Sequence, residues 1–354
     1  MLVRAARTLA LSATRQGVEG INFLHGKPFT VDASVLAVLS EIDDWTDADE
    51  LETRMDIGDD LVADLLGFGL LIDRDSPAAI REAEYEREWR WGLPAAALHF
   101  SLHDRAFISV EQSEALQVEK MSHRPSPACI QRNDRSTVVS QLPAPDPRGE
   151  LLGTMARRRT VRESSDETLS LAQLSSLLFS GLGITGQTSN AAGNLPLKMT
   201  PSGGARNPHE GYVYARRVRN LRPGVYHYSG ADQTLGLVND RPQATPAELV
   251  AGQAWADDAA AVFILVANLD RTMWKYDDPN AYRVVMIEAG HIFQNVMLIA
   301  TQIGWSACPT AAIARTPTLQ ALALEDSIVI EPVYALALMK PPGGLPASSV
   351  ATTH

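Results

Sequence analysis

Short apolar runs separated by polar turns fill the first 75 residues, and their spacing alternates between strand-like and helix-like periods. Three short helices with flanking strands are the outline of a winged-helix module. We therefore expect residues 1–75 to form a small winged-helix-like domain. The pattern places strands near residues 8–11, 20–25, 29–31 and 70–72, and helices after Asp32, through Leu51 and over residues 59–66.

The next stretch, residues 76–148, has a less regular pattern. A charged helix is predicted over residues 78–90, and prolines then cluster at residues 125–127 and 143–147. Proline-rich segments stay extended and act as spacers. We expect residues 76–148 to be a connecting helical and proline-rich region between two domains.

Helical and strand periodicities alternate from residue 149 onward, which predicts an α+β domain over residues 149–342. The last residues, 343–354, are expected to form a flexible C-terminal tail. Within the domain, helices are predicted near residues 171–179, 246–255 and 282–303, and strands near residues 211–215, 224–228, 261–266 and 329–338.

Charge narrows the classes of partner. The chain has 42 acidic and 31 basic residues and a net charge of −11, which opposes non-specific binding to nucleic acid or to an anionic membrane. The candidate recognition helix of the N-terminal domain contains Asp59, Asp60 and Asp64, the wrong sign for phosphate contacts. Such a module can instead offer a sheet edge to an extended peptide, or it can simply pack on its neighbour.

Cysteine content and hydropathy indicate a cytoplasmic protein with no membrane partner. Cys129 and Cys308 are too few and too far apart for a disulfide framework or a multi-cysteine metal site. No segment reaches the roughly 18 uninterrupted apolar residues that span a bilayer. His99, His103, His209 and His291 lack convincing metal spacing with carboxylates, so no metal site is predicted.

Four arginines and a threonine stand together at residues 157–162, at the start of the second domain. Guanidinium groups beside a hydroxyl are suited to bind a phosphomonoester, because the charges of the phosphate need more than one cation to offset them. The alternative is a solvated basic patch, which is the usual fate of a charge run.

A glycine-rich turn, Pro201-Ser202-Gly203-Gly204-Ala205-Arg206, precedes an apolar strand. The glycines allow the main chain to approach a flat or anionic ligand closely, and Arg206 can donate two hydrogen bonds to one acceptor. The turn lacks the Gly-Lys-Ser/Thr ending of a nucleotide P-loop. It is either a ligand loop or a tight turn that contains an arginine.

Lys275 and Tyr276 are adjacent and directly precede the long predicted helix. A lysine beside a tyrosine, partly shielded by Trp274, could move protons at a redox centre. The alternative is an extended surface lysine with a packing aromatic. After the helix, the small residues from Gly304 to Ala312 form a turn whose main-chain N–H groups can face an electron-rich ring.

Taken in order, these motifs resemble the nitroreductase superfamily of flavoenzymes, and within it the SagB-type azoline dehydrogenases. The resemblance covers roughly residues 150–342 and adds the Glu288-Ala289-Gly290-His291 stretch and the Cys308-Pro309 turn to the motifs above. It implies a nitroreductase-like fold, with a central mixed, mainly antiparallel sheet flanked by helices. It also implies an interlocked homodimer that binds FMN at the subunit interface.

The resemblance assigns site residues by position. Lys275 and Tyr276 match a pair implicated in proton removal while a hydride passes to the flavin. Ala311 and Met339-Lys340 differ from an acidic residue and a Gly-Arg ending in the nitroreductases, which loosens the assignments there. The implied FMN-binding residues are Arg158, Arg159, Thr160 and Arg162 for the phosphate and ribityl chain, Pro201, Ser202, Gly203 and Gly204 for the ring, Pro309, Ala311 and Ala312 near flavin N5, and Lys340 near the phosphate.

The function expected from the resemblance is oxidation of a thiazoline or oxazoline, or a related site, in a modified peptide, with oxygen regenerating FMN. The N-terminal domain would bind a leader segment, and a cyclodehydratase is a possible partner enzyme. Two other functions stay open: a flavin oxidoreductase for a small metabolite or a carrier-bound amino acid, and a non-catalytic scaffold in a peptide-modifying complex.

Overall fold

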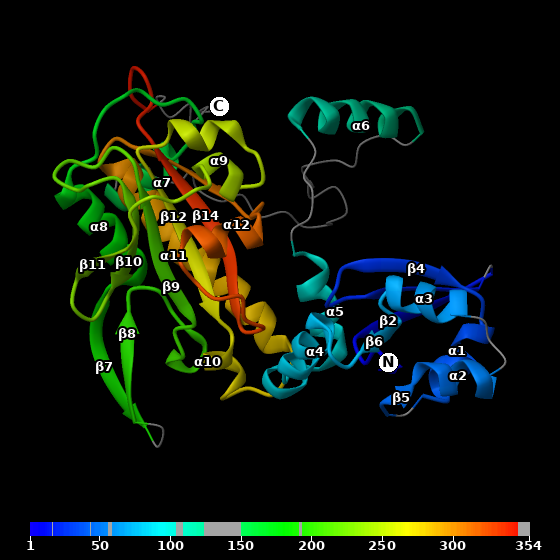
Figure 1. Ribbon diagram of the computed structural model, residues 1–354. Coiled ribbons are helices and arrows are strands. Elements are labelled where there is room, and N and C mark those ends of the chain that lie inside the picture. Colours follow the sequence, from blue (N-terminus) through cyan, green and yellow to red (C-terminus); the bar gives the residue numbers. More distant parts are fainter. Residues whose placement is uncertain are drawn as a thin grey trace, which may run out of the picture.

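The computed structural model describes residues 1–15, 17–42, 44–55, 59–103, 109–123, 150–190 and 193–345. Two globular parts lie side by side, the N-terminal residues on the right of Figure 1 and the larger C-terminal part on the left. The proline clusters and Cys129 lie outside the described residues, as do residues 346–354 of the predicted tail.

The N-terminal part consists of two small antiparallel sheets and three helices. Its core joins Val3 and Phe29 from the two sheets to Val38, Leu51 and Leu65 from the helices. The predicted helices are therefore present, and identity as a winged-helix domain stays a prediction. One sheet has the order β5 (Thr46–Asp47), β1 (Leu2–Ala5), β6 (Leu71–Asp73), the other is β2 (Leu9–Thr14), β3 (Gly17–Asn22), β4 (Lys27–Val31), and the helices are α1 (Ser34–Ser40), α2 (Ala48–Met55) and α3 (Asp59–Gly67).

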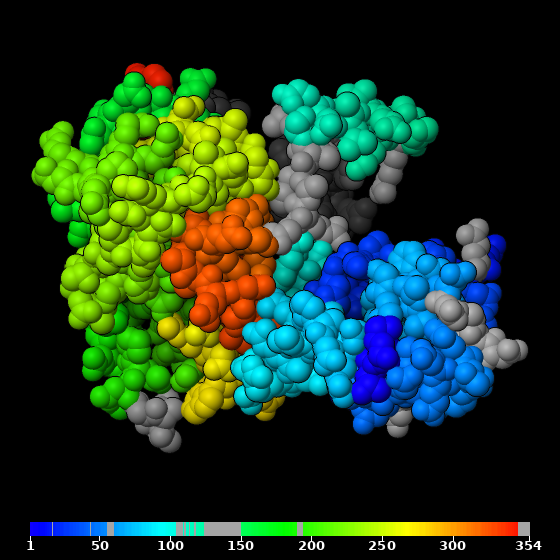
Figure 2. All heavy atoms as spheres, viewed as in Figure 1, coloured from blue at the N-terminus to red at the C-terminus, as the bar shows by residue number. Residues whose placement is uncertain are grey.

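The connecting region contributes α4 (Pro77–Glu88), α5 (Gly92–Ser101) and α6 (Val110–His123). Trp89, Trp91 and Phe100 from this region share one apolar cluster with Met273 and Val285 of the C-terminal part. Figure 2 shows α4 and its neighbours packed against the C-terminal part. The first half of the connecting region is thus a packed layer between the two parts.

A six-stranded sheet organises the C-terminal part, in the order β11-β10-β9-β12-β14-β13. All five neighbouring pairs are antiparallel, so the expectation of a mixed sheet is wrong in that respect. Short turns join β9, β10 and β11 into a meander, which antiparallel pairing allows. The strands are β9 (His209–Ala215), β10 (Gly224–Ser229), β11 (Thr234–Asn239), β12 (Ala261–Asn268), β13 (Ser306–Thr310) and β14 (Ile330–Met339).

Helices cover both faces of this sheet, which explains the continuous apolar run in β12. Phe263 and Leu265 face a core with α8 (Leu171–Leu182) and α11 (Asn280–Gln302). Val262 and Ile264 face a second core with α9 (Pro246–Leu249) and α12 (Arg315–Ala321). A strand that is buried on both faces needs apolar side chains at every position. The C-terminal part also contains the helix α7 (Glu150–Arg157) and the 3-10 helix η2 (Ala254–Asp258).

The long helix α11 is apolar and long enough to cross a membrane by length and composition, and half of its most apolar window is buried inside the protein. It packs closely on α8, where a β carbon at Gly181 would lie 3.0 Å from Ile292 and Val296. We therefore interpret α11 as the central core helix. A hairpin of β7 (Ile184–Asn190) and β8 (Gly193–Lys198) follows α8 and projects from the body in Figure 1.

Candidate functional site

The glycine-rich loop and the Lys-Tyr pair meet in the structure. Gly204 has a φ of 60° and lies directly under both side chains. A β carbon at this position would overlap Nζ of Lys275 and would lie 2.5 Å from Oη of Tyr276. Glycine therefore favours this backbone conformation, and a side chain here would displace the ends of Lys275 and Tyr276. The Nζ atom of Lys275 lies 5.1 Å from the centre of the Tyr276 ring.

A buried carboxylate supports the loop from beneath. Oε1 of Glu288, on α11, accepts a hydrogen bond of 2.6 Å from the backbone N–H of Gly203. Burial raises the pKa of Glu288, and the hydrogen bonds from Gly203 and Ser202 oppose that rise. Sequence reasoning noted Glu288 only as part of a helix motif. Its helical spacing from Ala281, Val285 and Ile292, on the apolar face of α11, was the available indication of a structural or functional role.

The short helix α10 (Asp270–Met273) and Trp91 set the position of the Lys-Tyr pair. The N–H groups of Lys275 and Tyr276 both donate to the carbonyl of Thr272. The indole N–H of Trp91, from the connecting region, donates to the carbonyl of Tyr276 at 3.0 Å. The expected shielding of Lys275 by Trp274 is not seen, because Trp274 is 60% exposed and stacks with the Arg206 guanidinium at 4.6 Å.

The arginine-rich segment forms a second group, along the edge strand β13. The hydroxyl of Ser306 accepts from the N–H of Val161 at 2.9 Å and lies 3.1 Å from the carbonyl of Arg159. Among the described residues, Arg158, Arg159 and Arg162 form no salt bridge. Their guanidinium groups contact a hydroxyl, main-chain carbonyls and the Trp255 ring instead. The cations are thus held in place without a carboxylate to neutralise them.

The remaining predicted residues lie at the same edge. Lys340 follows β14 directly, and its Nζ is 3.2 Å from Glu167 and 5.6 Å from the Trp305 ring. Pro309 pairs with Leu336 inside the sheet. The N–H of Ala312 donates to the Thr310 hydroxyl at 3.1 Å, so this amide is already engaged, whereas the side chain of Ala311 is exposed.

Cys308 belongs to the structure of this edge. Its thiol is buried and donates to the Val161 carbonyl at 3.0 Å. Burial raises the pKa of Cys308 to about 11, so the thiol stays protonated near neutral pH. Cys308 is therefore interpreted as a structural residue.

The two groups lie at opposite ends of β14. Ile330 pairs with Asn268, next to α10 and the Lys-Tyr pair, whereas Met339 pairs with Ser306, next to the arginine-rich segment. A strand rises by about 3.3 Å per residue, so the ten residues of β14 separate the groups by about 30 Å. Figure 1 shows α7 near the top of the molecule and α10 near its bottom. One chain therefore presents two partial sites.

Two known proteins are similar to part of this chain. The protein MJ1384 of Methanocaldococcus jannaschii, named as a nitroreductase, is 31% identical over 191 residues, which are 54% of this chain and 89% of that protein. The trifolitoxin-processing protein TfxB of Rhizobium leguminosarum bv. trifolii is 29% identical over 143 residues, 39% of this chain and 38% of TfxB. The chain thus spans well under half of TfxB.

Among solved structures, the Escherichia coli microcin synthetase McbBCD complex with truncated pro-MccB17 matches 77% of this chain and 95% of one of its chains, at 18% identity and a TM-score of 0.47. A likeness at that level supports no inference about activity. The model of the nitroreductase family matches residues 155–338, which contain both partial sites except Lys340. The chain belongs to the nitroreductase family.

Proposed function

We propose that this protein is an FMN-dependent dehydrogenase that oxidises a thiazoline, an oxazoline or a related site in a modified peptide, with oxygen as the final electron acceptor. The observation that supports this most directly is the contact of Lys275 and Tyr276 with Gly204. The family supplies the class of cofactor, since members of it bind FMN. The similarity to TfxB, a protein named for processing a toxin, supports a peptide as the substrate.

The residues present fit FMN. A phosphate needs cations that are not already neutralised, and the arginines at residues 158, 159 and 162 have no carboxylate partner among the described residues. A flat ring needs main chain that it can approach closely, and the loop of Ser202, Gly203 and Gly204 has two successive residues without a side chain. In this proposal the arginine-rich segment binds the phosphate, Lys340 exchanges its contact with Glu167 for the phosphate, and the glycine loop lies along the ring.

Desaturation removes one hydrogen as a hydride and its neighbour as a proton while a single bond becomes a double bond. FMN supplies the hydride acceptor when it is bound. Lys275 and Tyr276 present an amine and a phenol on the same side of the glycine loop, so the proton can pass to Nζ where the amine is neutral, or to Oη where the phenol is ionised. Glu288 holds the loop, and Trp91 holds the turn that presents the pair.

A homodimer is part of the proposal because one chain places its two partial sites at opposite ends of β14. A second copy could bring the glycine loop of one subunit to the arginine-rich segment of its partner. Apolar side chains on α7, α8 and α11 are available for such an interface. Leu151, Leu152, Met155, Leu171 and Ile287 are each 44–63% exposed in the single chain.

The test is to purify the protein, measure FMN per chain and offer it a cyclised precursor peptide. Loss of two hydrogens from the peptide, seen by mass spectrometry, is the expected result. Lys275→Ala and Tyr276→Phe should retain FMN and lose most of the turnover, whereas Tyr214→Phe, on the opposite face of the sheet, should behave as the wild type. A peptide of unchanged mass with oxidation of a free small metabolite would refute the peptide substrate. Absence of FMN would leave the scaffold function.

We further propose that the N-terminal domain binds the leader segment of the peptide on a sheet edge. Among the described residues, the strand β2 pairs only with β3, and Leu11 on it is 47% exposed. An extended peptide can add to such an edge through main-chain hydrogen bonds. Leu11→Asp should weaken binding of a fluorescent leader peptide at least tenfold without changing FMN content. Unchanged leader affinity would leave the domain a packing role.

A further inference from the structure

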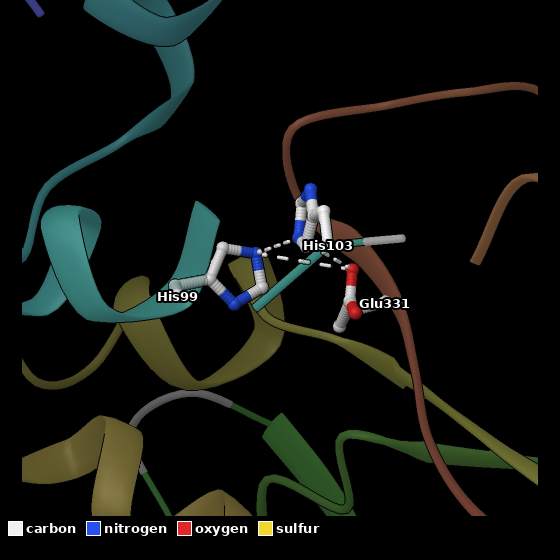
Figure 3. A group of neighbouring side chains, drawn as sticks. All are labelled: His99, His103 and Glu331. Atoms are coloured by element: carbon white, nitrogen blue, oxygen red, sulfur yellow. Dashed lines mark hydrogen bonds and ion pairs between the residues drawn. The ribbon is translucent and has the colours of Figure 1, made fainter. Parts of the chain in front are cut away.

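Two histidines and a glutamate from distant parts of the chain converge at the junction between α5 and β14. His99 lies near the end of α5, His103 lies one turn later, and Glu331 belongs to β14. Figure 3 shows the two imidazole rings and the carboxylate pointing toward one another. No metal site was predicted from the sequence here, because 228 positions separate His103 from Glu331 and only the fold brings them together.

The three ligand-type atoms have the spacing of a metal coordination shell. Nε2 of His103 is 3.3 Å from Nε2 of His99 and 3.2 Å from Oε2 of Glu331, and the remaining pair is 3.9 Å apart. Ligands bound to Zn²⁺ at about 2.1 Å with tetrahedral angles lie about 3.4 Å from one another. Two of the three separations match this value, and the third would shorten when an ion binds.

Each of the three side chains is held by a further contact. Nδ1 of His99 lies 3.1 Å from the Tyr282 hydroxyl, which turns Nε2 toward His103 and Glu331. Nε of Arg315 donates to Oε2 of Glu331 at 2.8 Å and fixes the carboxylate. The side chain of His99 is 2% exposed and that of Glu331 is 13% exposed. Ordered ligands in a largely buried setting favour binding of an ion, because little freedom is lost when it enters.

Acceptor groups offset the positive charge of the two arginines beside the site. Arg315 contacts Glu331, and its other donors bind Asp326 and the carbonyls of Ser327 and Ile330. Arg81 pairs with Glu84 and Asp326. His103, Arg81 and Arg315 line an open pocket, so water can reach the site and occupy a fourth coordination position.

We propose that His99, His103 and Glu331 form a site for a divalent transition-metal ion of the zinc type, with water as the fourth ligand. Two imidazoles and one carboxylate are a ligand set that suits Zn²⁺. The ion would join the connecting region to the central sheet of the C-terminal domain. The same junction already contains the hydrogen bond from Ile328 N–H to Glu84 and the Arg81–Asp326 ion pair. The site shares no residue with the glycine loop, the Lys-Tyr pair or the arginine-rich segment.

The test uses the full chain without an affinity tag of histidines, freed of metal by a chelator and then dialysed against Zn²⁺ or Co²⁺ alone. We expect one ion per chain by elemental analysis. We also expect a visible Co²⁺ absorption of the tetrahedral type at wavelengths beyond the flavin bands. Zn²⁺ should raise the melting temperature, since an ion that binds only the folded state stabilises it.

Variants separate the site from a hydrogen-bonded cluster without an ion. His103→Ala and His99→Gln should lose the bound ion, and Tyr282→Phe should weaken it about tenfold because it removes only a supporting contact. His123→Ala, on the exposed surface of α6, is the matched control and should bind one ion. His103 is partly exposed, so its variant tests the site even if the His99 variant fails to fold. A wild-type chain that binds no ion, or full occupancy in His103→Ala, would overturn the proposal.

Discussion

Glu288 accepts a hydrogen bond of 2.6 Å from the backbone N–H of Gly203, and this contact joins the core helix α11 to the loop proposed to face the flavin ring. Glu288→Gln keeps a carbonyl oxygen for the N–H group, so it should retain FMN. Glu288→Leu removes the acceptor and leaves a buried donor unpaired, which costs about 1–3 kcal/mol. FMN affinity measured by fluorescence titration should therefore fall at least tenfold in the leucine variant only. Equal affinities in the two variants would contradict the supporting role.

Gly204 should not tolerate a side chain. Alanine in a left-handed conformation costs about 1–2 kcal/mol, and its β carbon would displace Lys275 and Tyr276. We expect Gly204→Ala to lower the turnover of the peptide at least tenfold. Gly236→Ala is the control, because Gly236 has space around its α carbon and lies on β11 away from both partial sites. Normal turnover in Gly204→Ala would show that the close approach is not needed.

Helices and buried strands of the C-terminal domain could be predicted from the sequence because their apolar spacing is regular. The run in β12 and the period of α11 are examples, and each prediction lies within two or three residues of the observed element. The hairpin of β7 and β8 was missed because its threonines, glycines and asparagines resemble a polar loop. The strand β13 was predicted as a turn of small residues, and only its pairing with β14 makes it a strand.

Contacts at the candidate site depend on the fold in a way that no local pattern reveals. The sequence motifs singled out Gly204 and Lys275 separately, but their close approach requires β9 and β12 to lie side by side. No local motif marks Trp91, although its indole N–H donates to the carbonyl of Tyr276 across 185 positions. Long-range packing determines both contacts, so the structure was needed to find them.

The indole N–H of Trp91 should matter for turnover and not for FMN binding. Trp91→Phe keeps the apolar packing and removes the hydrogen bond to the Tyr276 carbonyl, which is worth about 1 kcal/mol. The Lys-Tyr turn becomes less fixed, so kcat should fall several-fold while FMN content stays the same. Trp89→Phe is the matched control, because its indole donates to Gly92 within the connecting region and not to the Lys-Tyr turn. Equal kcat values for the two variants would contradict the role of Trp91.

Stability should fall on mild acidification because of His209. Burial lowers the pKa of His209 to about 4, against an ordinary value of 6.5, although its hydrogen bond to the Val285 carbonyl opposes the shift. Between pH 6.5 and 4 the unfolded chain binds a proton that the folded chain does not. The free energy of unfolding should therefore decrease as the pH falls through this window, with a slope of at most about 1.4 kcal/mol per pH unit from this residue.

The variant His209→Gln isolates this contribution, because the amide can still donate to the Val285 carbonyl but does not titrate. Urea unfolding of both proteins at pH 6.5, 5.5 and 4.5 measures the slopes. The slope of the glutamine variant should be smaller than that of the wild type. Identical slopes would mean that His209 binds its proton in the folded state as easily as in the unfolded chain.

If each flavin site is built from two subunits, two inactive variants should complement each other. Arg162→Ala damages the arginine-rich segment and Lys275→Ala damages the pair on the glycine loop, and both side chains are exposed, so both variants should fold. A mixed dimer has one site with both changes and one site with neither. When the variants are co-expressed in equal amounts, half of the dimers are mixed, and each mixed dimer has one intact site of its two. About a quarter of all sites are then intact. Activity that stays at the level of the separate variants would show that the two groups do not meet across an interface.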